Sequence, residues 1–228
     1  MKFSEKLTFL LGNFSTSDEI GSVVKGLFFG LNNIKNMPDK NLKYPLILSN
    51  SGTGASFILI EKDKTYKRIG GTNLAGGTMS GIFSLLKEDI KFDSNVSEYI
   101  SSGDKNNADI LVKDIYGASY DSIGLNGNIV AGSLAKLNQY SGSDIKADVC
   151  ASTAYMICSN LIHLLYLYAT LHGAMTILFA GSFSTISAIS DLLLSISRDK
   201  LPKTIEYSVV DYGGYLGCLG IVSEILTE

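Results

Sequence analysis

Two glycine-rich turns lie close together in this chain, and they constrain its fold more than any other feature. The first, residues 49–56, follows the apolar run 46–48. The second, residues 70–78, leads into the apolar run 79–86. Glycine lets main-chain N–H groups approach a ligand without a Cβ in the way, and Ser and Thr hydroxyls suit phosphate or carboxylate oxygens. A strand, a turn, a hairpin and a helix start in this order predict a cradle for an anion.

Composition and charge exclude several classes of protein. The chain has 228 residues, 46% of them hydrophobic and 18% charged, so it can bury a substantial core. Its net charge of −3, without a local cluster of Lys or Arg, argues against a nucleic acid partner. Cys150, Cys158 and Cys218 form no CxxC pair and indicate neither a disulfide framework nor a metal site. With only a short apolar run near the N-terminus, we expect a cytoplasmic protein without a secretory signal.

The segment of residues 149–171 allows two interpretations. At roughly 20 residues it is long enough and apolar enough for a transmembrane helix. It also contains polar residues such as Asn160, and neither flank carries the basic cluster that sets membrane topology. We therefore expect a helix buried on most sides, in a large core or at a self-association face, and no membrane partner. His163 and His172 then have structural roles.

Apolar patterns and turn signals alternate along the chain and predict an α/β fold. Ligands of α/β sheets usually bind where strands end, so the turns at Gly52, Gly181 and Gly213 are predicted to share one crevice. The predicted strands are residues 46–50, 57–61, 66–69, 176–180 and 204–210. The predicted helices are residues 20–31, 77–86, 107–116 and 149–171, one that ends at Ser195 and one that follows Tyr215.

Several segments give the chain a resemblance to a known family. They are residues 50–56 (Asn-Ser-Gly-Thr-Gly-Ala-Ser), 66–68 (Tyr-Lys-Arg), 76–78 (Gly-Gly-Thr), 111–117 (Leu-Val-Lys-Asp-Ile-Tyr-Gly) and 214–215 (Gly-Tyr). From about Asp18 to its end, the chain resembles the eukaryotic-type (type II) pantothenate kinases. The run Lys-Asp-Ile-Tyr-Gly is more specific than a glycine turn, and it argues against another actin-like sugar or acetate kinase.

The resemblance implies an actin-like ATPase fold of the ribonuclease H-like class, in which two lobes close on ATP and Mg²⁺ and a mixed sheet is flanked by helices. It also implies that the substrate is pantothenate, that the protein is a homodimer, and that acetyl-CoA or another CoA thioester regulates it. The family carries an N-terminal Asp-x-Gly-Gly hairpin for ATP phosphates, and no such motif precedes Glu19. We therefore expect residues 1–44 to be a partial remnant of the first lobe with a linker, residues 45–228 to be the C-terminal kinase lobe, and the first lobe to be largely absent.

The resemblance also assigns roles to single residues. Glu19 matches the carboxylate that takes or orients the proton of the substrate hydroxyl, and Arg68 the cation that binds the pantothenate carboxylate or stabilises phosphoryl charge. Without the resemblance, Glu19 is typical of an acid at a helix start and Arg68 of a solvated hairpin residue. The implied substrate-binding residues are Thr53, Ser56, Arg68, Tyr116 and Tyr120. The implied nucleotide- or phosphate-binding residues are Gly52, Gly54, Gly76, Gly77, Thr78 and Gly181.

Departures from the family keep a second function open. Gly213 stands where the family carries Glu, while Ala151 and Thr185 stand where it carries arginines. Lost charges of this kind indicate weaker binding of a nucleotide or a regulator. The sequence therefore predicts either an ATP-dependent pantothenate kinase or a catalytically inactive relative that dimerises or binds CoA thioesters.

Overall fold

The computed structural model describes residues 17–34, 42–86 and 95–226. The chain divides into two compact units, residues 1–35 with 215–228 and residues 36–214, and each is described by itself. The sequence did not predict that residues 215–228 group with residues 1–35. The predicted domain boundary after residue 44 stays a prediction.

The smaller unit pairs two helices, α2 (Glu19–Asn33) and α9 (Leu216–Ile225). The side chain of Asp18 caps α2, because it accepts a hydrogen bond of 2.7 Å from a backbone N–H of the first turn. The helices cross backbone against backbone, and a Cβ on Gly26 would overlap with the carbonyl group of Leu216. Glycine at the crossing is therefore a condition for this pairing.

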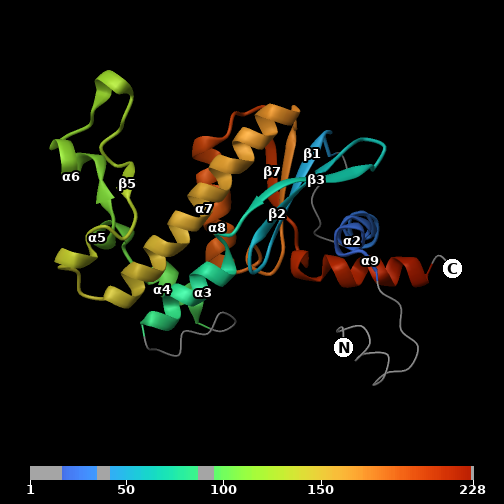
Figure 1. Cartoon of the computed structure of the whole chain (residues 1–228), viewed down its shortest axis with the longest axis horizontal. Coiled ribbons are helices and arrows are strands. Elements are labelled where there is room, and N and C mark those ends of the chain that lie inside the picture. Colours follow the sequence, from blue (N-terminus) through green and yellow to red (C-terminus); the bar gives the residue numbers. More distant parts are fainter. Residues whose placement is uncertain (1–16, 35–41, 87–94, 227–228) are drawn as a thin grey trace, which may run out of the picture. The chain divides into compact units, whose positions relative to one another are not determined.

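The larger unit is built on a five-stranded sheet with the order β3-β2-β1-β6-β7 (Figure 1). β1, β2 and β3 form antiparallel hairpins, whereas β6 and β7 run parallel to β1, so the sheet is mixed. The carboxyl ends of β1, β6 and β7 lie at one edge as a result. The predicted strands are confirmed, with ends that differ by a few residues. Their bounds are β1 (Leu46–Ser51), β2 (Ala55–Ile60), β3 (Tyr66–Thr72), β6 (Thr176–Ala180) and β7 (Glu206–Val209).

Helices flank this sheet and share a hydrophobic core with it. Alternate strand residues such as Ile47, Phe57 and Phe179 point to one face, where they join Ile157 and Leu193 from the helices. All five side chains are fully buried. The helices of this layer are α3 (Gly76–Leu85), α4 (Val96–Ser102), α7 (Ile145–His172) and α8 (Ser187–Lys200).

Helix α7 differs from its prediction in how it is buried. Among the described residues it is the one helix long and apolar enough to cross a membrane by length and composition. In the structure one face of α7 packs against the core, while Tyr166, Leu167 and Leu171 are exposed on its C-terminal half. The expectation of a helix buried on most sides therefore holds for the N-terminal half of α7, where residues 147–154 are all buried and α4, α5 (Lys105–Ala108) and α8 pack against the helix, and it is wrong for the C-terminal half. The predicted absence of a membrane partner stays a prediction.

The segment of residues 103–144 is where the predicted secondary structure is wrong. A single helix over residues 107–116 is replaced by α5 (Lys105–Ala108), β4 (Ile110–Leu111) and α6 (Val112–Tyr116), and β4 pairs with β5 (Val130–Gly132). The chain leaves α5 at Asp109, whose side chain bonds to a distant part of the chain. These contacts override the local helical pattern.

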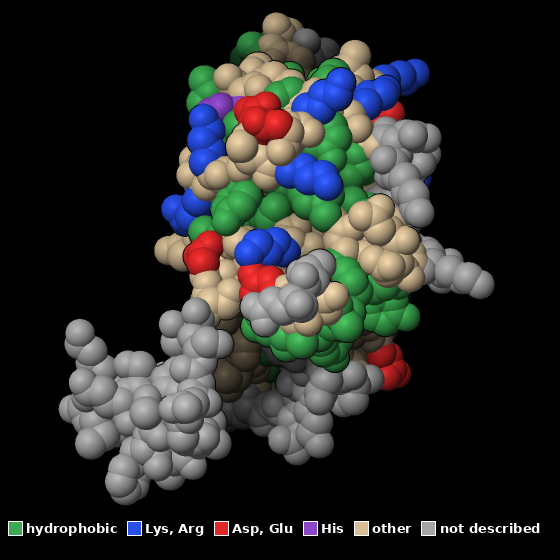
Figure 2. Space-filling view, turned by 90° about the vertical axis from the view of Figure 1, so that its right-hand side faces the viewer, with side chains coloured by type: hydrophobic (Ala, Val, Ile, Leu, Met, Phe, Trp, Pro, Cys, Tyr) green, Lys and Arg blue, Asp and Glu red, His purple; other side chains and the backbone are tan. Residues whose placement is uncertain are grey.

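Charges are mixed on the surface. On the face shown in Figure 2, Lys and Arg side chains are spread among acidic, polar and hydrophobic ones. The predicted absence of a nucleic acid partner stays a prediction.

Candidate functional site

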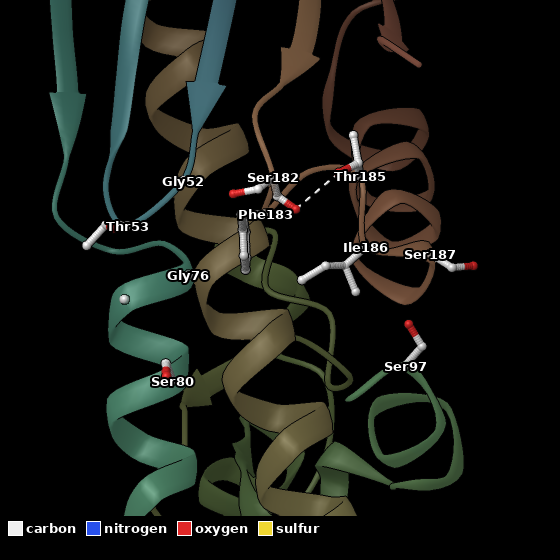
Figure 3. Close-up of a pocket in the computed structure, with 11 residues that line it drawn as sticks. Gly52, Thr53, Gly76, Ser80, Ser97, Ser182, Phe183, Thr185, Ile186 and Ser187 are labelled. Carbon is white, nitrogen blue, oxygen red and sulfur yellow. Dashed lines mark hydrogen bonds between the residues drawn. The ribbon is translucent and has the colours of Figure 1, made fainter. Parts of the chain in front are cut away.

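A cleft of about 790 Å³ lies where β1 and β6 end and where α3 and α8 begin (Figure 3). Its walls come from four segments that are far apart in the sequence: the β1–β2 turn, the start of α3, the start of α4, and the turn from β6 into α8. Figure 3 shows Phe183 and Ile186 pointing into the space between the α3 side and the α8 side. The lining residues are Gly52, Thr53, Gly76, Gly77, Ser80, Ser97, Ser182, Phe183, Thr185, Ile186 and Ser187.

The β1–β2 turn is joined directly to the start of α3. The N–H groups of Gly76 and Gly77 donate hydrogen bonds of 2.9 Å to the carbonyl oxygens of Gly52 and Thr53. A Cβ on Gly76 would lie 2.7 Å from the Gly52 oxygen, so a side chain there would push the two segments apart. Gly76 and Gly77 therefore give the cleft its space, while their N–H groups already have partners within the protein.

The turn after β6 approaches the end of β1 just as closely. Gly181 has a φ of +92°, and a Cβ on it would overlap with the backbone of Ser51. A Cβ on Gly213 would lie 3.1 Å from the nitrogen of Gly181, and one on Gly52 would lie 3.8 Å from the Ser182 hydroxyl. The three turns predicted to share a crevice do come together, although Gly213 does not line the cleft itself.

The cleft is polar but uncharged. Ser and Thr hydroxyls line both walls, and none of the lining residues is Lys, Arg, His, Asp or Glu. The Thr185 hydroxyl donates to the carbonyl of Ser182 over 3.1 Å (Figure 3), and the Ser97 hydroxyl accepts from the N–H of Ala188 in the first turn of α8. Hydroxyl groups and a cradle that a Cβ would fill suit phosphate oxygens. Neutralising phosphate charge would require groups from outside these walls.

No group of three or more His, Cys, Asp or Glu that could hold a metal ion occurs within the described residues. The cleft also contributes no carboxylate. Mg²⁺ in kinases is held largely by substrate phosphates and one or two carboxylates. These walls fit phosphate oxygens and do not supply the carboxylate ligands of magnesium.

Arg68 and Ser56 lie on the hairpin of β2 and β3 and do not line the cleft. Arg68 on β3 donates from Nε to the Ser56 hydroxyl on β2 at 3.4 Å, and its side chain is exposed. Gly71 leaves room for this side chain, because a Cβ there would lie 2.9 Å from a guanidinium nitrogen. Thr53 at the tip of the neighbouring turn lines the cleft. Gly54 in the same turn does not line it.

Thr78, another predicted phosphate-binding residue, points elsewhere. Its hydroxyl donates to the carbonyl of Asn73 over 2.8 Å and thereby closes the turn before α3. A ligand could use this hydroxyl only by replacing that bond. The structure therefore gives Thr78 a local structural contact.

Tyr116 and Tyr120 face each other outside the cleft. Their ring centroids are 5.0 Å apart and both side chains are exposed. The sequence allowed them to share a helix face, but α6 ends at Gly117, which has a φ of +79°. The rings meet because the chain turns back after α6.

Glu19 is the first residue of α2 and belongs to the smaller unit. Arg68, Thr53 and the cleft belong to the larger unit. The role of Glu19 as the base therefore stays a prediction.

Several cleft residues were not predicted as site residues. Ser97 comes from α4, a helix that the sequence pattern did not reveal, and Ser80 and Ser187 are single polar residues in helices. A second cavity of about 340 Å³ shares Thr185 and Ser187 with the cleft and adds two carboxylates, Asp191 and Asp211. The sequence contains one weak signal for these residues, because helices are predicted to begin where strands end, at the carboxyl edge of the sheet.

Comparison with solved structures gives the class of the fold. The chain is similar to the activator of the 2-hydroxyisocaproyl-CoA dehydratase from Clostridium difficile with bound ADPNP, at a TM-score of 0.54 and 13% identity, over 91% of this chain and 67% of that one. It is also similar to a ROK family glucokinase from Streptomyces griseus in complex with glucose and AMPPNP, at a TM-score of 0.50 and 13% identity, over 96% and 70%. The predicted actin-like ATPase fold is confirmed.

Comparison of sequences gives the family. The model of the Fumble family matches residues 1–224, and the chain belongs to this family of pantothenate kinases. It is 33% identical over 241 positions to pantothenate kinase 1 of Arabidopsis thaliana, covering 96% of this chain and 61% of that protein. It is 31% identical over 196 positions to pantothenate kinase of Schizosaccharomyces pombe, covering 81% and 47%.

A further relative carries a different activity in its name. The chain is 33% identical over 178 residues to the 4'-phosphopantetheine phosphatase of Mus musculus, covering 78% of this chain and 22% of that protein. The chain thus spans between about a fifth and three fifths of the length of these curated relatives.

Proposed function

We propose that the protein acts in ATP-dependent phosphorylation of pantothenate to 4'-phosphopantothenate, the first step of coenzyme A biosynthesis. The observation that carries the proposal is the cleft at the sheet edge, with glycines in close backbone contact and hydroxyl groups on both walls. Such a cleft suits phosphoryl transfer, which depends mainly on positioning and charge stabilisation. Two relatives are named pantothenate kinases, which supports pantothenate as the proposed substrate.

In the proposed reaction, Thr53 and Ser56 orient pantothenate and Arg68 binds its carboxylate or the developing phosphoryl charge. ATP supplies the phosphoryl group, and Mg²⁺ held by its phosphates would supply part of the neutralising charge. The terminal hydroxyl of pantothenate gives its proton to the carboxylate of Glu19 while its oxygen bonds to the γ-phosphorus. The bond between that phosphorus and the bridging oxygen breaks, and ADP leaves. By the resemblance to the family, Tyr116 and Tyr120, which do not line the cleft, also contact the acceptor in the proposed reaction.

A phosphorylation assay with pantothenate and ATP tests this proposal, using the chain alone and mixed with a longer relative. Replacing the proposed base, Glu19→Gln, should lower kcat about a hundredfold or more, in the usual range for general base catalysis. Glu98→Gln is the matched control, because Glu98 is also an exposed acid in the first turn of a helix. Absence of turnover in both arrangements would refute kinase activity for this chain.

The second candidate function is an inactive subunit that dimerises or binds CoA thioesters. The uncharged lining of the cleft favours it, since no cation there would hold ATP phosphates. Titration calorimetry separates the two candidates. Binding of acetyl-CoA without binding of MgATP supports the inactive subunit, and tight MgATP binding argues against it. Homodimerisation and a cytoplasmic location are part of both proposals.

A further inference from the structure

The arm, residues 103–144, is an insertion between α4 and α7 that carries Tyr116 and Tyr120. Figure 1 shows its elements α5, α6 and β5 beside α7 and away from the five-stranded sheet. The main hydrophobic core contains no described residue of the arm. Other contacts must therefore fix its position.

The strongest of these contacts converge on Asp148, in the first two turns of α7. Its side chain is 4% exposed, and its carboxylate accepts three hydrogen bonds. At the start of the arm, the donors are the N–H of Asp104 at 2.7 Å and the side-chain amide of Asn107 at 2.9 Å. At the end of the arm, the donor is the hydroxyl of Tyr140 at 2.6 Å. One buried carboxylate thus joins both ends of the arm to the core helix.

A second buried carboxylate, that of Asp109 in the arm, makes a similar contact with α7 at Ser152, one turn beyond Asp148. Asp109, which is fully buried, accepts from the hydroxyl of Ser152 and, at 2.9 Å, from the N–H of Leu134. Leu134 has a φ of +61°, a strained backbone that this bond helps to hold. The other oxygen of Asp109 has no hydrogen-bond partner. Asp109 therefore fixes the middle of the arm through one oxygen only.

Close backbone contacts show that the arm is seated in one position. A Cβ on Gly103 would overlap with the carbonyl of Ala147, and one on Gly142 would lie 2.6 Å from a carboxylate oxygen of Asp148. Both ends of the arm thus lie against the first turns of α7 with no space for a side chain. A small displacement of the arm would break these contacts and the hydrogen bonds of Asp148 together.

We infer that Asp148 and Asp109 are positioning residues that hold the arm, and with it Tyr116 and Tyr120, in place for binding of the acceptor substrate. This inference rests on the proposed function for the role of the two tyrosines. Neither carboxylate touches the cleft or a substrate. Because the arm is held by hydrogen bonds to two side chains, losing one carboxylate loosens the arm and leaves the core of the larger unit folded.

Amide hydrogen exchange on the full chain tests the structural part. The reporters are N–H groups that bond within the arm, those of Val112, Lys113 and Lys136. In Asp148→Ala they should exchange about tenfold faster or more, as expected when buried hydrogen bonds are lost. Amides of β1 and β6 should be unchanged. The matched control is Asp144→Ala, which removes the cap of the same helix and leaves the three bonds of Asp148 intact.

Tyr140→Phe is the milder variant, since it removes one hydrogen bond and keeps the ring. It should speed exchange in the arm by a smaller factor than Asp148→Ala. Arm amides that exchange at the same rate in Asp148→Ala and in Asp144→Ala would overturn the inference. If Asp148→Ala does not fold, the exchange rates of the arm amides in Tyr140→Phe are compared with those in Asp144→Ala instead.

Steady-state kinetics test the functional part. Asp148→Ala should raise KM for pantothenate about tenfold with kcat nearly unchanged, the pattern of lost uniform binding. An arm that loosens without any change in KM would overturn the role in acceptor binding. A wild-type chain without turnover would refute the proposed function instead, and the exchange comparison then decides whether the two carboxylates hold the arm.

Discussion

The cleft and the arm differ in how far their structures depend on side-chain hydrogen bonds. At the cleft, backbone meets backbone, and glycines such as Gly76 and Gly181 leave no space for a side chain. In the arm, the side chains of Asp148 and Asp109 bridge segments that do not belong to the main core. The cleft is thus sensitive to added atoms, whereas the arm, which also has close contacts at Gly103 and Gly142, is in addition sensitive to the removal of a carboxylate. Substitutions can test this difference separately in each region.

The largest effect is expected for Gly181→Ala at the cleft. The residue has a φ of +92°, and its new methyl group would overlap with the backbone of Ser51. We expect the free energy of unfolding to fall by about 3 kcal/mol, from backbone strain and overpacking together. Denaturant unfolding measures this change.

The control for this substitution is Gly173→Ala, just before the same strand. Gly173 also has a positive φ, +64°, but a Cβ there meets nothing within 4 Å. Gly173→Ala should therefore lower the free energy of unfolding by about 1 kcal/mol, which is the cost of placing a residue with a Cβ in the left-handed region. Equal losses in the two variants would mean that backbone contact does not limit the cleft.

The next largest effect is expected for Asp109→Ala in the arm. It leaves the buried hydroxyl of Ser152 and the partly buried N–H of Leu134 without an acceptor, which lowers the free energy of unfolding by about 2 kcal/mol. Asp109→Asn keeps the oxygen that accepts both hydrogen bonds. It should lower the free energy of unfolding by less than Asp109→Ala does, because it also removes a buried charge whose second oxygen has no partner. Thermal unfolding of the two variants makes the comparison. An asparagine variant that is less stable than the alanine variant would contradict it.

Sequence reasoning succeeded where structure depends on neighbours in the chain. The strands from β1 to β3 follow from apolar runs and a hairpin turn, and the cleft follows from glycines placed where strands end. The strand β6 has the predicted bounds. In each case the signal lies within a few residues of the element that it predicts.

The arm could not be predicted in the same way, because its structure depends on distant contacts. Asp109 leaves the predicted helix to reach Leu134, 25 residues away, and Ser152, 43 residues away. Asp148 reaches back 44 residues to Asp104. The apolar pattern over residues 107–116 depends only on these ten residues, so it cannot indicate partners that lie so far away in the sequence. The same limit applies to Ser97, whose contribution to the cleft depends on how α4 packs.

A smaller effect is expected from adding a charge to the cleft. Thr185→Arg places a guanidinium at a lining position where no charged residue lies. If ATP phosphates occupy the cleft, the affinity for MgATP should rise about tenfold, the gain of one charge-assisted hydrogen bond. Thr185→Gln, long but neutral, is the control, and calorimetry measures both. The same affinity in the two variants would place the phosphates elsewhere.

The last prediction concerns the pH range in which the arm stays attached. Burial raises the pKa of Asp148, but the hydrogen bonds from Tyr140, Asp104 and Asn107 outweigh it, and the pKa lies below its usual value of 3.8. Burial, the bond to Asp148 and the nearby charges of Asp148 and Asp144 raise the pKa of Tyr140 to about 12. A lowered acid pKa stabilises the folded arm above about pH 4, and this contribution is lost as the pH falls below that range. A raised tyrosine pKa stabilises it below pH 10, and this contribution is lost as the pH rises toward 12.

Ultraviolet titration of Tyr140, with Tyr140→Phe subtracted, checks the alkaline limit. Asp148→Asn should lower the pKa of Tyr140 more than Asp144→Asn does, because Asp148 contributes both a hydrogen bond and a charge, whereas the Asp144 side chain contributes only a charge. The protection of the arm amides, relative to their exchange in an unfolded chain at the same pH, should hold from about pH 4 to about pH 10 and decline outside this range, where the stabilisation from one of the two shifted groups is progressively lost. If the two variants shift the pKa of Tyr140 equally, the carboxylate of Asp148 is not its hydrogen-bond partner in solution. The arm would then be held by Asp109 and the close backbone contacts at Gly103 and Gly142, as the cleft is held by its glycines.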